Sequence, residues 1–403
     1  MNLESIINLD EQYYMNVFGK RIPIVFEKGK GCYLYDSNNK KYLDFISGIA
    51  VNSLGHCHKR LTEAIIDQAN KLIHTSSLYY IKNQALLAQK LCNKSIFDKA
   101  FFCNSGAEAV EGAIKLIRKY FYSKGQNRYE IITLKNAFHG RTLATVTATG
   151  KDKYKKPYEP LPRGFKNIEK DIEIIKNSIN ENTAAIMIEL VQGEGGVNVL
   201  DKSFVKDIEN ICRENNILFV IDEVQTGIGR CGSLFAYELY DISPDIITLA
   251  KGLGGGIPIG AVLCKEDVAA FEPGDHGSTF GGNPFATRIA LEVLNVIEEE
   301  DLLTNVNNIG KLFLEGLKDI KNKITSIVDV RGLGLLIGVE FKSNVKELNL
   351  LLAQNGLLAS MSGEGNVIRF APPLIVNEEA INEALNIFEN VVRHYENVGG
   401  FNK

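Results

Sequence analysis

The sequence predicts an α/β fold with a mostly parallel central sheet. Between residues 98 and 265, short and nearly continuous apolar runs alternate with segments of helical periodicity. Strands of this kind are buried on both faces, as in a parallel sheet covered by helices. The chain has 403 residues, of which 45% are hydrophobic, and this is enough to build a large core.

The expected elements follow in order along the chain. Two aromatic-rich runs at 32–36 and 41–45 flank a polar turn and predict a hairpin, and apolar residues at helical spacing predict a helix over 58–72. The six expected strands of the central sheet are 100–103, 131–134, 184–188, 217–221, 246–250 and 259–263.

The pattern changes after a predicted helix at 284–299. Expected strands within 326–341 and 366–370 lie between expected helices at 302–320, 345–354 and 378–396. We therefore expect three parts. They are an N-terminal segment (1–50) packed with the small domain, a large ligand-binding domain (51–289) and a small C-terminal α+β domain (290–403).

Composition excludes several classes of protein. The 45 basic and 49 acidic residues give a net charge of -4, which argues against nucleic-acid or anionic-membrane partners. No apolar run approaches the roughly 18 residues of a membrane span, and the N-terminus lacks a signal-peptide pattern. Seven widely spaced cysteines without a CxxC motif favour a reducing, cytoplasmic compartment. The consecutive residues His56, Cys57 and His58 are not expected to bind a metal, because neighbouring side chains rarely converge on one ion.

Chemistry-bearing residues follow the first two expected strands of the sheet, where ligands of α/β proteins bind. Ser105 and Gly106 open a predicted helix whose free N–H groups suit a phosphate, although Ser is also an ordinary N-cap. Phe138 could cover a flat ring and Arg141 could hold a carboxylate. The alternative is an aromatic core residue and a surface arginine.

Three more strands are followed by charged residues. Glu194 lies among glycines, where it could pair with a movable cation or simply accompany a turn. Asp222 could serve a cofactor or cap a turn. Lys251 is unusual directly after an apolar strand, and partial burial there would make its amine nucleophilic. The small-residue loop at 277–284 could donate hydroxyls to a phosphate or be a turn.

The glycine motif at 227–232 matches GxGxxG but does not predict a nicotinamide site. Such a site requires the motif to connect a strand directly to a helix. Here five residues intervene after the strand, and no clear helix follows.

Together, a phosphate cradle, a ring-covering aromatic, an acidic residue and a nucleophilic lysine are the parts of a pyridoxal phosphate site. The motifs in order are NSGAEA (104–109), FHGRT (138–142), QGEGG (192–196), IDEVQTG (221–227), AKGLGGGIPIG (250–260) and GDHGSTFGGNP (274–284). On these motifs the chain resembles the class III aminotransferases over nearly its whole length. The resemblance implies the type I pyridoxal phosphate aminotransferase fold and a homodimer with shared active sites.

The resemblance also implies roles in binding pyridoxal 5'-phosphate. Lys251 would bond the cofactor and carry a proton, Asp222 would pair with the ring nitrogen, and Gln225 would bond the ring hydroxyl. Val224 and Phe138 would cover the two ring faces, and Thr279 would reach the phosphate of the neighbouring subunit. The full expected cofactor-binding set is Ser105, Gly106, Ala107, Phe138, Asp222, Glu223, Val224, Gln225, Lys251 and Thr279. Many members have Thr at position 107, so Ala107 lacks a hydroxyl that others have.

The implied substrate residues are carboxylate-binding arginines and their neighbours. Arg141, with Ser278 close by, would hold the substrate α-carboxylate, and Arg369 would hold a carboxylate of glutamate or 2-oxoglutarate. Glu194 would pair with Arg369 while an ω-amine is bound. Within the class, the last two motifs most resemble those of members that act on N2-acetylornithine. The resemblance therefore implies transfer of the ω-amino group of N2-acetylornithine to 2-oxoglutarate, a step of arginine biosynthesis.

Other functions stay open at this point. The same chemistry could act on ornithine, succinylornithine, succinyl-diaminopimelate or 4-aminobutyrate, because acyl-group recognition lies in loops with weak signatures. A pyridoxal phosphate enzyme without amino transfer, such as an aminomutase, is a second alternative. A nicotinamide oxidoreductase and a catalytically silent binding protein are alternatives of other classes.

Overall fold

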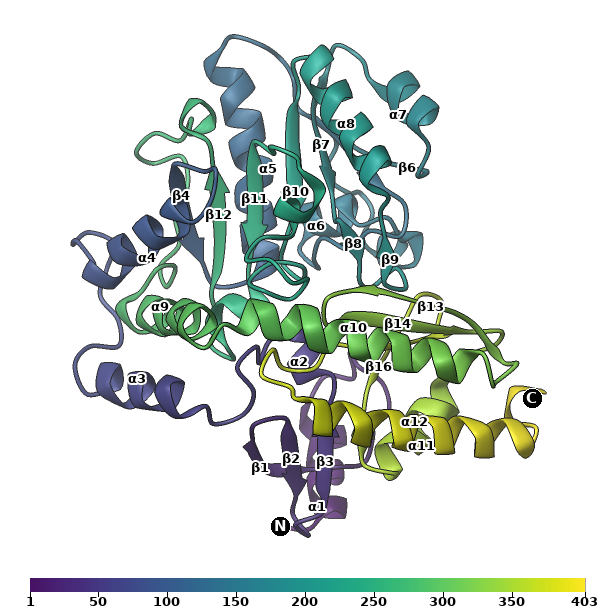
Figure 1. Ribbon diagram of the computed structural model, residues 1–403. Coiled ribbons are helices and arrows are strands. Elements are labelled where there is room, and N and C mark those ends of the chain that lie inside the picture. Colours follow the sequence, from purple (N-terminus) through teal and green to yellow (C-terminus); the bar gives the residue numbers. More distant parts are fainter. Residues whose placement is uncertain (403) are drawn as a thin grey trace.

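The computed structural model describes residues 1–402, and its largest sheet has seven strands in the order β4-β12-β11-β10-β7-β5-β6 (Figure 1). They are β4 (Lys99–Cys103), β5 (Glu130–Leu134), β6 (Phe165–Ile168), β7 (Thr183–Ile188), β10 (Leu218–Asp222), β11 (Ile246–Leu249) and β12 (Gly260–Cys264). β12 is antiparallel to β11 and β4, and the other pairs are parallel. The mostly parallel sheet is therefore confirmed. β6 was not expected, because this half-buried edge strand carries Lys166 and Asn167 instead of an apolar run.

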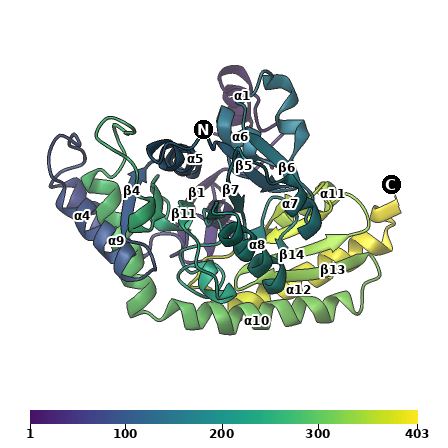
Figure 2. The same cartoon turned by 90° about the horizontal axis from the view of Figure 1, so that it is seen from above.

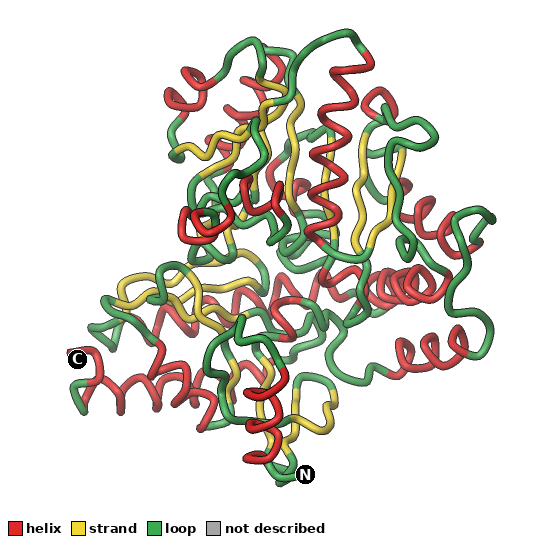
Figure 3. Tube along the Cα trace, turned by 180° about the vertical axis from the view of Figure 1, so that it is seen from behind, coloured by secondary structure: helices red, strands yellow, loops and turns green. Residues whose placement is uncertain are grey.

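Helices cover both faces of this sheet. α5 (Gly106–Ser123) packs on one face and α8 (Lys202–Glu214) on the other (Figure 2), and α5 is the long helix in front of the sheet in Figure 3. In β7, Ala185 and Met187 join the core under α5, whereas Ile186 and Ile188 join the core under α8. Burial on both faces explains why the strands read as continuous apolar runs.

The C-terminal part has its own antiparallel sheet, in the order β13-β14-β17-β16, with α10 and α12 packed against each other beside it (Figure 1). Its strands are β13 (Ile327–Leu333), β14 (Leu336–Phe341), β16 (Ser360–Ser362) and β17 (Val367–Phe370). A two-stranded ribbon, β8 (Val191–Gln192) with β9 (Asn198–Val199), carries the Glu194 turn.

The N-terminal strands form a separate small sheet with a strand from the C-terminal part. The predicted hairpin is β2 (Tyr33–Asp36) with β3 (Lys41–Asp44), flanked by β1 (Phe26–Lys30). β3 pairs in parallel with β15 (Leu357–Leu358), so the N-terminal segment contacts the C-terminal part of the chain. The division of the chain at residues 50 and 290 stays a prediction.

The remaining helices confirm the expected positions within a few residues where an expectation was made. They are α1 (Leu3–Tyr13), α2 (Ser47–Ala50), α3 (Lys59–Ala69), α4 (Lys82–Asn93), α6 (Leu143–Ala148), α7 (Ile172–Ser178), α9 (Pro284–Glu299), α10 (Leu302–Lys321), α11 (Lys346–Gln354) and α12 (Glu378–Asn397). None of the helices described in residues 1–402 has the length and apolar character needed to cross a membrane.

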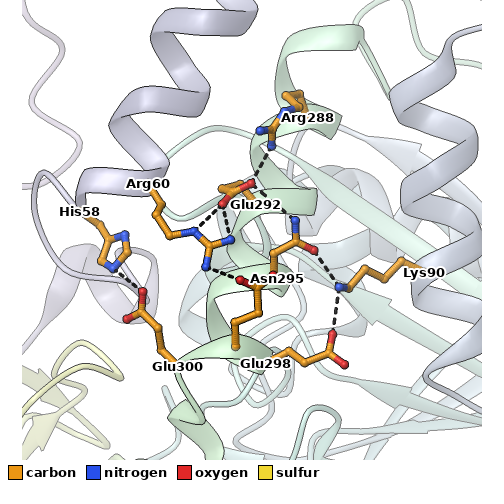
Figure 4. Close-up of polar contacts among 9 residues, drawn as sticks. His58, Arg60, Lys90, Arg288, Glu292, Asn295, Glu298 and Glu300 are labelled. Atoms are coloured by element: carbon orange, nitrogen blue, oxygen red, sulfur yellow. Dashed lines mark hydrogen bonds and ion pairs between the residues drawn. The ribbon is translucent and has the colours of Figure 1, made fainter.

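A polar network fixes α9 against α3 and α4 (Figure 4). Arg60 of α3 binds Glu292 and Glu299 at 2.7–2.8 Å, and Lys90 of α4 binds Asn295 at 2.8 Å and Glu298 at 3.0 Å. The helix α9 begins directly after the loop with Ser278 and Thr279.

The two histidines of the adjacent His-Cys-His triplet face different carboxylates. His58 faces Glu300 (Figure 4), with Nε2 at 3.4 Å from Oε1, and His56 Nε2 lies 2.7 Å from Asp44 Oδ2. In the described chain, no three His, Cys, Asp or Glu side chains gather as metal ligands would.

Candidate active site

A cavity of about 380 Å³ opens where the parallel strands of the large sheet end. Its walls come from the segments that follow β4, β5, β7, β10 and β11, and from residues just before β12. Parallel strands deliver their carboxyl ends to one edge, so residues far apart in sequence meet there. The expected residues that line it are Ser105, Gly106, Ala107, Phe138, Arg141, Glu194, Asp222, Val224, Gln225 and Lys251.

One end of the cavity is the N-terminus of α5. Ser105 is the N-cap of this 18-residue helix, and the Glu108 N–H donates to its Oγ at 3.1 Å. The N-cap interpretation of Ser105 is confirmed, and the phosphate interpretation stays a prediction. The capped helix end opens into the cavity, where such an end can bind an anion. A Cβ at Gly106 would lie 2.6 Å from Val224 Cγ1, so glycine lets Val224 pack against the helix start.

Asp222 forms the floor of the cavity and is held by three donors. Its Oδ2 accepts from His139 Nδ1 at 2.7 Å, while its Oδ1 accepts from the Thr248 hydroxyl and the Val224 N–H, each at 3.0 Å. Burial would lower the pKa of His139, but the hydrogen bond and charge of Asp222 outweigh burial and raise it. The result is a fixed carboxylate backed by a histidine, which favours a positive charge on a ligand above it.

Lys251 lines the same cavity at the exit of β11. Burial, followed by the positive charge of Arg369, lowers the pKa of its amine to about 8. A larger fraction of the amine is therefore neutral near pH 7 than for an ordinary lysine, and the neutral amine is the nucleophile. Its backbone φ of 40° lies in the left-handed region, a strain that is typical of functional positions.

Gln225 has a free donor that fits a ligand in the cavity. Its Nε2 is buried and has no hydrogen-bond partner within residues 1–402. A Cβ at position 193 would meet Gln225 Oε1 at 1.6 Å, so Gly193 makes room for this side chain. Buried donors are normally satisfied, and the ring hydroxyl of pyridoxal phosphate would satisfy this one. The lysine, the carboxylate, the apolar Phe138 and Val224 and the helix N-terminus fit the same cofactor.

An ion pair lies next to the cavity, between Glu194, which lines it, and Arg369. Arg369, 2% exposed, binds Glu194 Oε1 through Nη1 at 2.6 Å and donates from Nε to Ser360 Oγ at 3.1 Å. Burial would raise the pKa of Glu194, but the charge and hydrogen bond of Arg369 hold it below its ordinary value. The pair therefore neutralises Arg369 in this structure.

Arg141 is held differently. Its guanidinium stacks 3.7 Å from the Tyr154 ring centre and 5.5 Å from that of Phe138. It is exposed and forms no ion pair with a carboxylate in the described chain. Its charge is therefore free to bind a carboxylate in the cavity.

Four expected residues lie outside the cavity lining: Arg369, which pairs with Glu194, and Glu223, Ser278 and Thr279. The buried carboxylate of Glu223 accepts from the Ala236 and Tyr237 N–H groups at 2.7 and 2.8 Å, so this side chain does not point into the cavity as a cofactor contact would. Ser278 and Thr279 line a separate polar hollow, and Ser278 reaches the cavity indirectly by accepting from Asn104 Nδ2 at 3.0 Å. The position of Thr279 outside its own cavity is compatible with the expectation that it serves a neighbouring subunit.

Sequence reasoning missed two residues of the site. His139 was left without a role, because its partner Asp222 lies 83 residues away in the chain. Glu189 directly follows β7, much as Asp222 is the last residue of β10. It is 6% exposed, lines the cavity and accepts from the Phe138 N–H at 2.8 Å. Burial raises the pKa of Glu189 to about 7. Its place at the end of an apolar strand was a signal that could have identified it.

The fold and the site define a pyridoxal-phosphate-dependent aminotransferase. The model of the family "Aminotransferase class-III" matches residues 14–392, so the chain belongs to the class III aminotransferases. It is 50% identical to the acetylornithine aminotransferase of Caldanaerobacter subterraneus subsp. tengcongensis, over 96% of this chain and 99% of the relative. It is 49% identical to the acetylornithine aminotransferase of Methanocaldococcus jannaschii, over 97% and 98% of the two chains.

A solved structure agrees with this family. The ornithine aminotransferase of Toxoplasma gondii is 33% identical and superimposes with a TM-score of 0.94, covering 98% of this chain and 95% of that one. That structure has partial occupancy of pyridoxal phosphate at its active site. The type I fold expected from the motifs is confirmed.

Proposed function

We propose that the chain is an N2-acetylornithine:2-oxoglutarate aminotransferase of arginine biosynthesis, which forms N-acetylglutamate semialdehyde and glutamate. The observation that carries the proposal is the Glu194–Arg369 pair at 2.6 Å beside a lysine-bearing cavity. An ω-amine substrate presents no second carboxylate there, whereas 2-oxoglutarate does. The two relatives named acetylornithine aminotransferase support the choice of amine.

The cofactor supplies an electron sink that makes a proton at the substrate carbon removable. Ser105, Gly106 and Ala107 would hold its phosphate, and Asp222 its ring nitrogen. Gln225 would donate to the ring hydroxyl, and Phe138 and Val224 would cover the ring. Glu223 is not among the residues proposed to bind the cofactor, because its carboxylate is bonded to the Ala236 and Tyr237 N–H groups.

Lys251 carries the chemistry that the chain itself provides. Its Nζ, with a pKa of about 8, would bond the cofactor and would carry a proton at the reacting carbon. Arg141 orients the substrate by its α-carboxylate. His139 and Asp222 keep a negative charge at the floor of the cavity.

Glu194 allows one cavity to accept two kinds of substrate. While it pairs with Arg369, the site presents no free cation to a neutral side chain. When 2-oxoglutarate enters, its second carboxylate takes the place of Glu194 on Arg369. Exchange of one carboxylate for another keeps the buried guanidinium paired, which avoids the cost of an unpaired buried charge.

We further propose a cytoplasmic homodimer. Thr279, with Ser278 beside it, would reach the cofactor phosphate of the neighbouring subunit. The seven cysteines are all free thiols in the described chain, which supports a reducing compartment.

The test is glutamate formation from 2-oxoglutarate with a panel of amines. We expect N2-acetylornithine to give the highest kcat/KM, above ornithine, succinylornithine, succinyl-diaminopimelate and 4-aminobutyrate. Ornithine is the second candidate, because a structural neighbour is an ornithine aminotransferase. A higher kcat/KM for free ornithine would contradict the proposed substrate, and no glutamate from any amine would contradict amino transfer.

A further inference from the structure

Lys151 is a buried lysine beside the Glu194 turn. It directly precedes the short 3-10 helix Asp152–Tyr154 and is 7% exposed. Its Nζ donates to the backbone carbonyls of Glu194 and Gly363, each at 3.0 Å. One ammonium therefore ties the turn that carries Glu194 to the turn between β16 and β17.

The surroundings of Lys151 are poor in compensating charge. Glu364 Oε1 lies 3.6 Å from its Nζ, but the Glu364 side chain is 74% exposed. Burial lowers the pKa of Lys151, which reflects the cost of keeping an ammonium there. A methionine would fill the same space at a lower free-energy cost. The two carbonyl contacts of Lys151 therefore need an explanation.

The Glu194 turn is held from further sides. The Gly363 N–H donates to the Glu194 carbonyl at 3.1 Å, and Arg331 donates to the Gly196 carbonyl at 2.6 and 3.1 Å. The Glu194 carboxylate, in contrast, is held by Arg369. The backbone of the turn is thus fixed, while the side chain can leave Arg369 by rotation.

We propose that Lys151 is a positioning residue for the Glu194–Arg369 pair. By holding the Glu194 carbonyl, it keeps the carboxylate within reach of Arg369 and restricts the exchange to rotation of the Glu194 side chain. It thereby sets the preference of the cavity between ω-amine and dicarboxylic substrates. The inference rests on the proposed function, because it assigns a supporting residue to that exchange.

The test compares Lys151→Met with Lys155→Met in the holoenzyme. Lys155 is a matched control: it belongs to the same segment, is 9% exposed and bonds Asn167 and Asp152 rather than the Glu194 turn. The rates of the two half-reactions are measured separately, one with N2-acetylornithine and one with 2-oxoglutarate. Binding of glutarate, an unreactive dicarboxylic acid, is measured by titration.

For Lys151→Met we expect a looser pair, and hence an Arg369 that is more often free. The ratio of kcat/KM for N2-acetylornithine to that for 2-oxoglutarate should fall about tenfold, the scale on which positioning residues change coupling. Glutarate should bind more tightly than to the wild type. Lys155→Met should leave the ratio and glutarate binding unchanged.

An unchanged ratio for Lys151→Met, which includes equal losses in both half-reactions, would overturn the inference, as would unchanged glutarate binding. If Lys151→Met yields no folded holoenzyme, Lys151→Gln is measured in the same way, since it removes the charge and shortens the reach of the donor. An unchanged ratio there also overturns the inference. Failure of the proposed function is distinct: wild-type enzyme would form no glutamate from N2-acetylornithine.

Discussion

The two arginines that would bind carboxylates are built in opposite ways. Arg141 is exposed and stacks on Tyr154, with its charge unpaired by any carboxylate of the described chain. Arg369 is 2% exposed and is paired with Glu194 at 2.6 Å. One arginine is always available to a substrate, and the other is available only when Glu194 leaves.

This difference shows how one site can bind the two ends of a substrate independently. Both substrates of the proposed reaction have an α-carboxylate, which suits a permanently free arginine. One of them has a second carboxylate, which suits an arginine with a replaceable partner. A buried free guanidinium would be costly, so burial and pairing occur together at Arg369.

Lys251→Ala should have the largest effect and should slow the half-reactions of both substrates alike. Without the amine, the reaction loses its nucleophile and proton carrier, so both half-reactions should fall by about 10⁴-fold or more. Stopped-flow measurement of each half-reaction checks this. Retained turnover without a covalent cofactor adduct would contradict the role of Lys251.

Arg141→Gln should weaken both substrates. Hydrogen bonds to charged groups contribute about 1.5–3 kcal/mol, so kcat/KM should fall about 10- to 100-fold for N2-acetylornithine and for 2-oxoglutarate. Steady-state kinetics with each substrate varied in turn measures the effect. A loss confined to one substrate would show that Arg141 does not serve the group they share.

Arg369→Gln should separate the substrates. We expect a fall of about 10- to 100-fold in kcat/KM for 2-oxoglutarate and a change within about threefold for N2-acetylornithine. Arg393→Gln is the control, because Arg393 pairs with Glu389 within α12. Equal losses for both substrates would contradict the claim that Arg369, unlike Arg141, binds only the second carboxylate of 2-oxoglutarate.

Tyr154→Leu should have a smaller effect, which arises because Arg141 loses the ring on which it stacks. At an exposed arginine such a contact contributes about 0.5–1 kcal/mol, so the KM of both substrates should rise about 2- to 5-fold with little change in kcat. Tyr158→Leu, a change at a nearby tyrosine that is 58% exposed, is the control. An unchanged KM would mean that Arg141 does not need the Tyr154 ring.

Much of the fold could be predicted from the sequence, because strands buried on both faces read as continuous apolar runs. Each of the six expected strands is present, whereas the half-buried β6 carries polar residues and gave no such signal. The positions of Ser105, Asp222 and Lys251 at strand ends were predictable in the same way. The roles of Val224 and Gln225, in contrast, came from the resemblance to the class III aminotransferases.

Contacts between distant segments were not predictable from local pattern. Asp222 and Glu223 are neighbours after the same strand, yet only Asp222 lines the cavity, because alternate side chains of an extended segment point in opposite directions. The His139–Asp222 bond and the carbonyl contacts of Lys151 join segments that only the folded chain brings together. The spacing of single residues in the sequence does not predict such contacts.

The measurement that tests the central claim most directly is the pair of half-reaction rates of Glu194→Gln, which keeps the size of the side chain and removes its charge. The account predicts that kcat/KM for N2-acetylornithine falls about 10-fold or more, because Arg369 is no longer neutralised. The value for 2-oxoglutarate should stay within about threefold of wild type, or rise. An unchanged N2-acetylornithine half-reaction, or equal losses in both, would contradict the account.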